Sequence, residues 1–232
     1  MAVIALCKHF YSHRHHLQQT CPRPQSVSWP ALSRVVQVDL SLLAETFPYT
    51  ELPEMTHVIL LRGVMPSGRN RVPMAQLRAA LTAAGLADVR SHIQSGNIIA
   101  GSRLAPARLA LLVHQVIARD IGADIAVIVR TPAQIERVLA DNPFADADSS
   151  RVYFTLLAAP PAPQSVRDLL ALEFEPDAVC MRDDTIYTRY ATRLSDSRYT
   201  NNFFERKLKV AATTRNFNTL SRLLELAQPR SD

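Results

Sequence analysis

The sequence from Met55 to about Leu226 predicts an α+β fold made of two successive βαββαβ units and a C-terminal helix. Three observations predict this fold. Short apolar runs that end at turn residues are typical of buried strands, and longer segments repeat their apolar residues at helical spacing. Proline begins and glycine ends several of the helical segments. The order of elements, which occurs twice, is that of the split-βαβ or ferredoxin-like unit, also called the α/β plait.

The first unit, residues 55–131, contains all six elements in order. A buried strand at 57–61 leads through a loop to a helix that Pro73 begins and Gly85 ends. The remaining elements are two strands at 89–93 and 98–100 joined by the turn Ser95-Gly96-Asn97, a helix from Pro106 to Gly122, and a fourth strand at 125–130.

The second unit, within residues 132–228, repeats that order after a linking helix. Thr131, Pro132 and Gln134 have the pattern of a capping box at the start of the linking helix. The elements that follow are a strand at 152–157, a helix at 164–172, a hairpin of 178–182 and 185–189 across Asp183-Asp184, a helix at 197–208, a strand at 210–213, and the C-terminal helix. The pattern therefore predicts two tandem ferredoxin-like domains, at 55–131 and 132–228.

Residues 1–54 differ from the rest of the chain. They hold four histidines, several early prolines and the only tryptophan, Trp29, but no secretory signal pattern. A zinc site is an alternative by residue type, but the spacing of its candidate ligands, Cys7, His9, His13 and Cys21, matches no tetrahedral motif. We expect this leader to be disordered or to come from a start codon placed too early, with the folded body beginning at Met55.

The formal net charge is +5, and it arises from residues 55–232 because the leader holds equal numbers of acids and bases. Nearly all of the 26 basic residues are arginines, and lysine occurs only at Lys8, Lys207 and Lys209. Guanidinium groups suit forked contacts to phosphate or carboxylate. A GC-rich genome would produce the same bias, so the composition leaves both interpretations open.

Several classes of protein are disfavoured. No apolar stretch approaches the roughly 18 residues of a membrane span, and three cysteines form no disulfide framework. We therefore expect a cytoplasmic protein without membrane contact. Residues 55–232 show no metal-ligand spacing, so no metal or cofactor is expected. The loop 63–68 precedes Arg69 and Asn70 rather than the Lys and Ser/Thr of a P-loop, which argues against a nucleoside triphosphatase.

Seven short motifs occur in one order along the chain: Leu60-Leu61-Arg62-Gly63, Asn70-Arg71-Val72-Pro73-Met74, Leu77-Arg78, Gln94-Ser95-Gly96-Asn97, Val129-Arg130-Thr131, Asn142-Pro143-Phe144, and Ala212-Thr213-Thr214-Arg215-Asn216-Phe217-Asn218-Thr219. Together they resemble the domain of unknown function 1697 family, an uncharacterised bacterial family. The resemblance implies a tandem pair of ferredoxin-like domains and no particular activity. The chain departs from the family's usual Ile-Asn-Val-Gly-Gly loop, here Val64-Met65-Pro66-Ser67-Gly68, and from its usual terminal Trp, here Phe217.

Polar residues from three segments form the candidate ligand site. They are Arg62 and Asn70 after the first strand, Gln94, Ser95 and Asn97 around the central turn, and Thr214, Arg215, Asn216 and Asn218 at the start of the last helix. An arginine at a helix N-terminus is unfavourable because the helix dipole is positive there, and a bound anion would relieve the repulsion. We therefore expect one anion-accepting cleft. The structural alternative is helix capping by Thr214 or Asn216 and a simple tight turn at 95–97.

The leading hypothesis is a binding module whose Arg/Asn/Gln-lined cleft holds a phosphate-bearing small molecule or nucleic acid. One alternative is a metal-independent enzyme that uses the same cleft, with His92 or Ser95 as proton carrier. Another is an oligomeric scaffold whose basic face meets an acidic partner. RNA binding on a ferredoxin-like sheet would use exposed aromatic rings, for which Tyr153, Tyr187 and Tyr190 are candidates. The sequence leaves the catalytic residues and the oligomeric state open.

Overall fold

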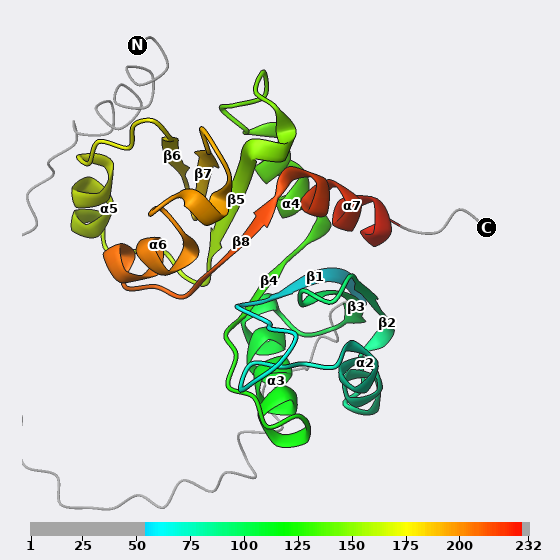
Figure 1. Ribbon diagram of the computed structural model, residues 1–232. Helices are drawn as coiled ribbons and strands as arrows, with labels where there is room; N and C mark the ends of the chain where they lie inside the picture. Colours follow the sequence, from blue (N-terminus) through cyan, green and yellow to red (C-terminus); the bar gives the residue numbers. More distant parts are fainter. Residues whose placement is uncertain (1–53, 229–232) are drawn as a thin grey trace, which may run out of the picture. The chain divides into compact units, whose positions relative to one another are not determined.

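The computed structural model describes residues 54–228. These residues contain two four-stranded antiparallel sheets and six α-helices, which is an α+β architecture (Figure 1). Apart from Glu54, the predicted leader and its candidate zinc ligands lie outside the described residues. No helix among residues 54–228 combines the length and apolar character that crossing a membrane requires.

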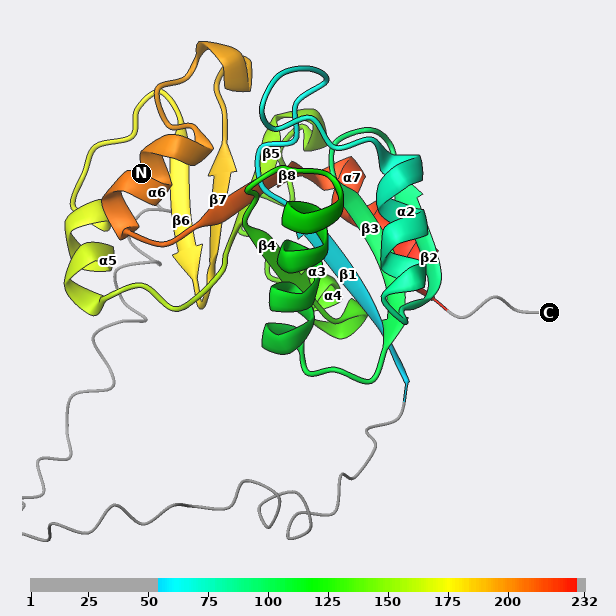
Figure 2. The same cartoon turned by 90° about the horizontal axis from the view of Figure 1, so that it is seen from below.

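The first sheet has the strand order β2-β3-β1-β4, and each neighbouring pair is antiparallel. Its strands are β1 (Met55–Leu61), β2 (Ala87–His92), β3 (Asn97–Ser102) and β4 (Val127–Arg130). Helices α2 (Met74–Ala83) and α3 (Pro106–Asp120) cover one face (Figure 2). Ile59 and Leu61 of β1 point into that face, where they share a fully buried apolar core with Leu77 and Val113 of the two helices.

The second sheet repeats this arrangement with the strand order β6-β7-β5-β8, again antiparallel throughout. Its strands are β5 (Val152–Leu157), β6 (Ala178–Arg182), β7 (Thr185–Arg189) and β8 (Ala212–Asn216). Helices α5 (Pro163–Leu170) and α6 (Asn201–Leu208) cover one face, and Leu169 and Phe204 pack there against Leu157 and Ile186. Two short 3₁₀ turns, η2 (Ser149–Arg151) and η3 (Leu194–Asp196), lie in the connections.

A third apolar core joins the two sheets. Val58 of β1 and Phe154 of β5 lie in one buried cluster with residues of α4 (Pro132–Ala140) and α7 (Phe217–Ala227), among them Ile135 and Leu220. Side chains alternate between the two faces of a strand. The continuous apolar run of β1 therefore serves two cores at once, with Val58 and Ile59 on opposite faces.

The aromatic rings considered for RNA stacking are not available on the sheet surfaces. Tyr187 is 2% exposed and Tyr190 is 1% exposed. Tyr153 is partly buried and makes an edge contact with Tyr190 at 5.2 Å between ring centroids. Because the central strands are covered on both faces, bases cannot stack on these rings as they do on an open sheet.

Local sequence signals are confirmed at several element ends. Thr131 and Gln134 form the predicted capping box at the start of α4, and Pro132 occupies its first turn. Gly85 and Gly122 have φ angles of +90° and +78°, the left-handed conformation expected after α2 and α3.

Two elements near the C-terminus have different bounds from those predicted. The predicted helix at 197–208 begins only at Asn201, as α6, and the predicted strand at 210–213 is β8 at Ala212–Asn216. Arg215 therefore lies inside a strand and not at the start of a helix. The strand continues that far because Thr214 and Arg215 keep pairing with Thr155 and Phe154 of β5.

His57 gives the fold a predicted pH dependence. This β1 residue is 2% exposed, with Nδ1 2.9 Å from the Met55 carbonyl oxygen, and burial lowers its pKa below the usual 6.5. Both states are neutral well above pH 6.5, and below it the unfolded chain takes up the proton first. We expect the free energy of unfolding to fall as the pH drops from about 6.5 through the folded pKa, measured by urea unfolding.

The matched variant is His57→Gln, which cannot titrate. Its loss of stability between neutral and mildly acidic pH should be smaller than that of the wild type. His114→Gln, at a partly exposed position on α3, serves as the control for the loss of an imidazole side chain. An identical pH dependence in wild type and His57→Gln would contradict the assignment.

Candidate functional site

Arg215 brings two of the three predicted segments together. From β8 of the second sheet, its guanidinium reaches the first sheet at the end of β1 and the turn before β3. Nε donates to Asn97 Oδ1 at 2.6 Å, and Nη2 donates to the carbonyls of Leu61 at 2.8 Å, Ser95 at 3.1 Å and Gly96 at 3.3 Å. The two sheets are thus linked by hydrogen bonds between residues more than a hundred positions apart.

Every acceptor around Arg215 is a neutral oxygen. Nη1 completes the set by donating to Thr213 Oγ1 at 2.7 Å and to the Thr214 carbonyl at 2.9 Å. No carboxylate within the described residues pairs with this guanidinium. Although the whole side chain is half-buried, its charged end is deep enough that burial lowers the Arg215 pKa to about 10.

These contacts use every N–H donor that an arginine has. In this structure Arg215 therefore has no donor left for a ligand. The positive charge of Arg215 is stabilised by the dipoles of these carbonyl and side-chain oxygens. The hydrogen bonds hold the segments that carry those oxygens in place. The expected anion-accepting role of Arg215 finds no support in this geometry, and its visible role is to hold the sheets together.

Asn97 and Ser95 complete the turn that receives Arg215. Asn97 is 0% exposed, and its Nδ2 donates to the His92 carbonyl at 3.3 Å and to Ser95 Oγ at 2.9 Å. The Ser95 hydroxyl is engaged by this amide, and no base among the described residues hydrogen-bonds to it. The geometry is that of a tight turn, the structural alternative to a nucleophilic serine.

Gly96 allows this turn to pack directly on the end of β1. Its φ is +76°, and the Leu61 amide donates to its carbonyl at 2.8 Å. A Cβ at this position would lie 2.7 Å from both Leu61 Cβ and Val64 Cγ2. Only glycine fits, both because of the positive φ and because of the close approach of the Leu61 and Val64 side chains.

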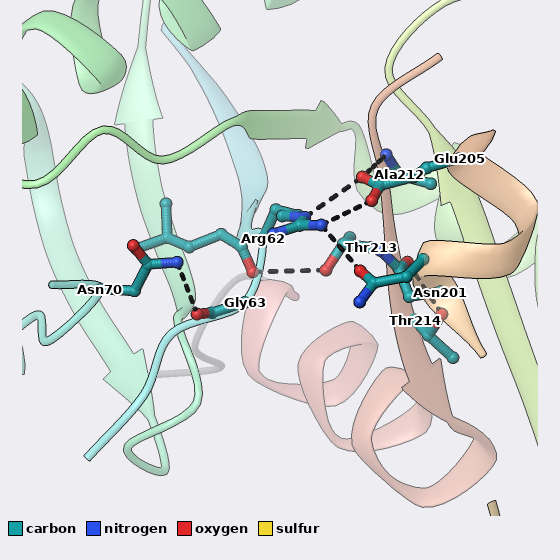
Figure 3. Close-up of polar contacts among 10 residues, drawn as sticks. Arg62, Gly63, Asn70, Asn201, Glu205, Ala212, Thr213 and Thr214 are labelled. Atoms are coloured by element: carbon teal, nitrogen blue, oxygen red, sulfur yellow. Dashed lines mark hydrogen bonds and ion pairs between the residues drawn. The ribbon is translucent and has the colours of Figure 1, made fainter. Parts of the chain in front are cut away.

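Arg62 is also paired within the protein, as Figure 3 shows. Its Nη2 contacts Glu205 Oε2 at 2.6 Å and donates to Asn202 Oδ1 at 2.8 Å, while Nε donates to Glu205 Oε1 at 3.2 Å. Glu205 Oε1 also accepts the Ala212 amide at 2.9 Å. Arg62 therefore has a carboxylate partner within the protein. The hydrogen bonds from Arg62 to Glu205 raise the Arg62 pKa.

The remaining predicted residues have separate roles. Asn70 Nδ2 donates to the Gly63 carbonyl at 3.4 Å, and Gln94 Nε2 donates to the Val72 carbonyl at 2.8 Å, so both hold the loop after β1. Thr214 Oγ1 lies 2.8 Å from Thr155 Oγ1 and donates to Asn201 Oδ1 at 3.0 Å.

The last two predicted residues belong to the start of α7. Asn216 caps this helix by accepting the Thr219 amide at 2.9 Å, as the capping alternative predicted. Asn218 is exposed in its first turn. Of the nine predicted residues, Arg62, Ser95, Asn97, Thr214 and Arg215 meet at the junction of the sheets, and the other four lie around it.

The sequence analysis missed Glu205 and Thr213 as members of this junction. Thr213 Oγ1 donates to the Leu61 carbonyl at 3.3 Å in addition to accepting from Arg215. Glu205 had one usable signal, because it is one of two acids in the basic stretch 189–222. Thr213 had none beyond its place in the motif. Within residues 54–228, no three His, Cys, Asp or Glu side chains gather as a metal site would.

The junction predicts a large stability difference between two arginine substitutions. Arg215→Met removes the donor to six oxygens and leaves Asn97 Oδ1 buried without a partner. We expect a loss of about 3 kcal/mol in the free energy of unfolding, measured by urea titration. Arg222→Met, which breaks an exposed pair with Glu225, should change it by less than about 1 kcal/mol. Equal effects of the two substitutions would contradict the structural role of Arg215.

The chain is similar in sequence to one protein family and similar in fold to a solved bacterial structure. The family model described as "Protein of unknown function (DUF1697)" matches residues 55–187. The solved structure of the conserved bacterial protein SP0830 from Streptococcus pneumoniae is similar, with a TM-score of 0.59 and 21% sequence identity over 75% of this chain and 99% of that chain. At this identity the likeness shows the fold alone. No curated protein matches the chain. Because the family model spans more than half of the sequence, the chain belongs to the DUF1697 family of proteins of unknown function.

Proposed function

We propose that the protein is a binding module that holds the phosphate groups of a nucleic acid on an exposed basic surface. The surface comprises Arg69 and Arg71 in the loop between β1 and α2, together with Arg206 on α6. All three side chains are exposed. The observation that carries the proposal is the Arg62–Glu205 ion pair, because it fixes that loop beside α6.

The loop and the helix are held in this position by specific contacts. Arg62 binds Asn202 and Glu205 of α6, and the loop that follows folds back on itself through the Met65 amide, which donates to the Asn70 carbonyl at 3.0 Å. Figure 3 shows Asn70 and Gly63 on one side of Arg62, and Glu205 on the other. Arg206 follows Asn202 by one helical turn and so shares its face of α6.

The charges around this surface favour an anion. Arg69, Arg71 and Arg206 form no ion pair among the described residues. Glu205, the acid that α6 presents here, is already bound to Arg62 and to the Ala212 amide. Forked guanidinium groups suit phosphate oxygens. Because the tyrosines of the sheets are buried, the proposal involves backbone phosphates and not base stacking, which predicts sequence-independent and salt-dependent binding.

We propose that each sheet with its helices is a ferredoxin-like domain, at residues 55–131 and 132–228, in a cytoplasmic protein. In support, both halves have the βαββαβ order, and in both sheets the first and third strands of the unit lie at the centre. The alternatives of a metal-independent enzyme and of an oligomeric scaffold remain hypotheses, and no contact in residues 54–228 favours either of them.

The test is the salt dependence of oligonucleotide binding. A fluorescent single-stranded oligonucleotide should bind the wild type. The logarithm of its binding constant should fall linearly with the logarithm of the salt concentration. The triple substitution Arg69→Ala, Arg71→Ala and Arg206→Ala should reduce the magnitude of that slope by about 2, since each phosphate contact contributes roughly 0.7 for a single strand.

A charge-matched triple variant gives the control. Arg108→Ala, Arg119→Ala and Arg222→Ala remove the same charge from exposed positions on α3 and α7. This variant should keep nearly the wild-type slope. No measurable salt-dependent binding by the wild type, or the same loss in both triple variants, would reject the proposed surface.

A further inference from the structure

A groove of about 450 Å³ lies between α4 and the hairpin of β6 and β7. None of the nine residues predicted from the sequence lines it. Its volume falls in the range of about 300–1,000 Å³ that is usual for small-molecule sites. One wall is a single face of α4, where Gln134, Arg137, Val138 and Asp141 recur at helical spacing.

The floor of the groove is a partly buried ion pair, in which the Arg130 side chain is 9% exposed and the Asp184 side chain 42%. Arg130 at the end of β4 donates to Asp184 Oδ2 at 2.7 Å and to the Leu157 carbonyl at 2.6 Å. Its own burial lowers the Arg130 pKa, and the Asp184 charge partly offsets that effect. Arg130 also donates to the Val129 carbonyl at 3.0 Å, so its contacts lie within the protein and the pair shapes the groove.

Two further arginines at the groove have donors to spare. Arg182 is exposed and uses Nη1 to donate to the Asp141 carbonyl at 2.7 Å, which ties the β6–β7 hairpin to the end of α4. Arg137 is exposed on α4 and forms no ion pair within the described part of the chain. They approach the same groove from opposite walls. Two guanidinium groups placed in this way can bind one phosphate or carboxylate group.

Tyr187 adds a neutral donor to the groove. The side chain is 2% exposed and lines the groove, and none of the hydrogen bonds within residues 54–228 involves its hydroxyl. The buried side-chain atoms that lack a partner among the described residues are Arg90 Nε and Thr188 Oγ1, so the Tyr187 hydroxyl is open to the groove. An edge contact with Phe154, at 5.5 Å between centroids, holds the ring. Burial, and secondarily the charge of Asp141, raises the Tyr187 pKa, so the hydroxyl stays protonated and can donate.

We propose that this groove binds a small hydroxylated organic anion, with its phosphate or carboxylate on Arg137 and Arg182 and one of its oxygens on the Tyr187 hydroxyl. The carboxylates of Asp141 and Asp183, which also line the groove, would accept hydrogen bonds from the ligand hydroxyls. Val138 and Pro160 give an apolar surface on which a carbon skeleton can lie. This chemistry fits a sugar phosphate or a sugar acid.

The groove is separate from the surface proposed for nucleic acid, since the two share no residue. The two proposals can therefore fail independently. Substitutions in the groove should leave the salt dependence of oligonucleotide binding unchanged, and the Arg69, Arg71 and Arg206 variant should keep its response to small anions.

The experiment measures the thermal unfolding of the full chain with ribose 5-phosphate, gluconate or inorganic phosphate as the probe. A ligand that binds only the folded state raises the unfolding temperature by mass action. We expect ribose 5-phosphate or gluconate to stabilise the wild type, and Arg137→Met to abolish the shift. Tyr187→Phe should weaken the binding of that probe about threefold to tenfold, as the loss of one hydrogen bond does.

The variants also separate binding from folding. Because Arg137 is exposed and the Tyr187 hydroxyl has no protein partner, neither substitution should lower the unfolding temperature without ligand. Arg108→Met, an exposed position on α3, controls for the change in charge. A response to ribose 5-phosphate alone identifies a phosphate ester as the ligand, and a response to gluconate alone identifies a carboxylate.

Four results would overturn the proposal. The first is no response of the wild type to either hydroxylated probe, and the second is an equal response in Arg137→Met. The third is an unchanged affinity in Tyr187→Phe, because the hydroxyl would then play no part in the site. A response to inorganic phosphate that equals the response to ribose 5-phosphate would likewise exclude recognition of the hydroxylated skeleton.

Discussion

The junction between the two sheets depends on the hydrogen bonds that the Arg215 guanidinium donates. This guanidinium is a buried cation without a carboxylate partner, held by six neutral oxygens from β8, the end of β1 and the turn before β3. An unpaired buried charge is costly unless its hydrogen bonds are satisfied. Because moving any of these oxygens would leave the buried charge less well satisfied, the hydrogen bonds of Arg215 fix the relative positions of the three segments. The Arg62–Glu205 pair belongs to the same junction, and the loop after β1 begins next to Arg62.

This arrangement changes where a ligand can bind. Arginine, asparagine and serine clustered in the sequence resemble an anion site, but Arg215, Asn97 and Ser95 hydrogen-bond to one another. The packing of both sheets against α4 and α7 also covers the faces that an isolated sheet of this kind would offer. The surfaces that we propose for recognition are the exposed basic surface on the loop and α6, and the groove beside α4.

The sequence was informative where structure is local. The capping box at Thr131, the left-handed glycines after α2 and α3, and the Asp183-Asp184 hairpin each depend on a few adjacent residues, and each was predicted. Arg215 was misplaced because its conformation follows from pairing with β5, some 60 residues away in the sequence. The partner of Arg62 lies 143 residues away, and the walls of the groove come from α4 and a later hairpin. No local pattern encodes such pairings.

The coupling between Asn97 and Arg215 is the most direct measure of the proposed junction. A double-mutant cycle with Asn97→Ala and Arg215→Met, followed by urea unfolding, isolates the interaction that crosses from the first sheet to the second. Because the two side chains meet at 2.6 Å in a buried setting, the double variant should be more stable than the sum of the single losses predicts, by at least about 1 kcal/mol. Losses that add to within about 0.5 kcal/mol would show that the two residues act independently, and would contradict the view that Arg215 joins the sheets.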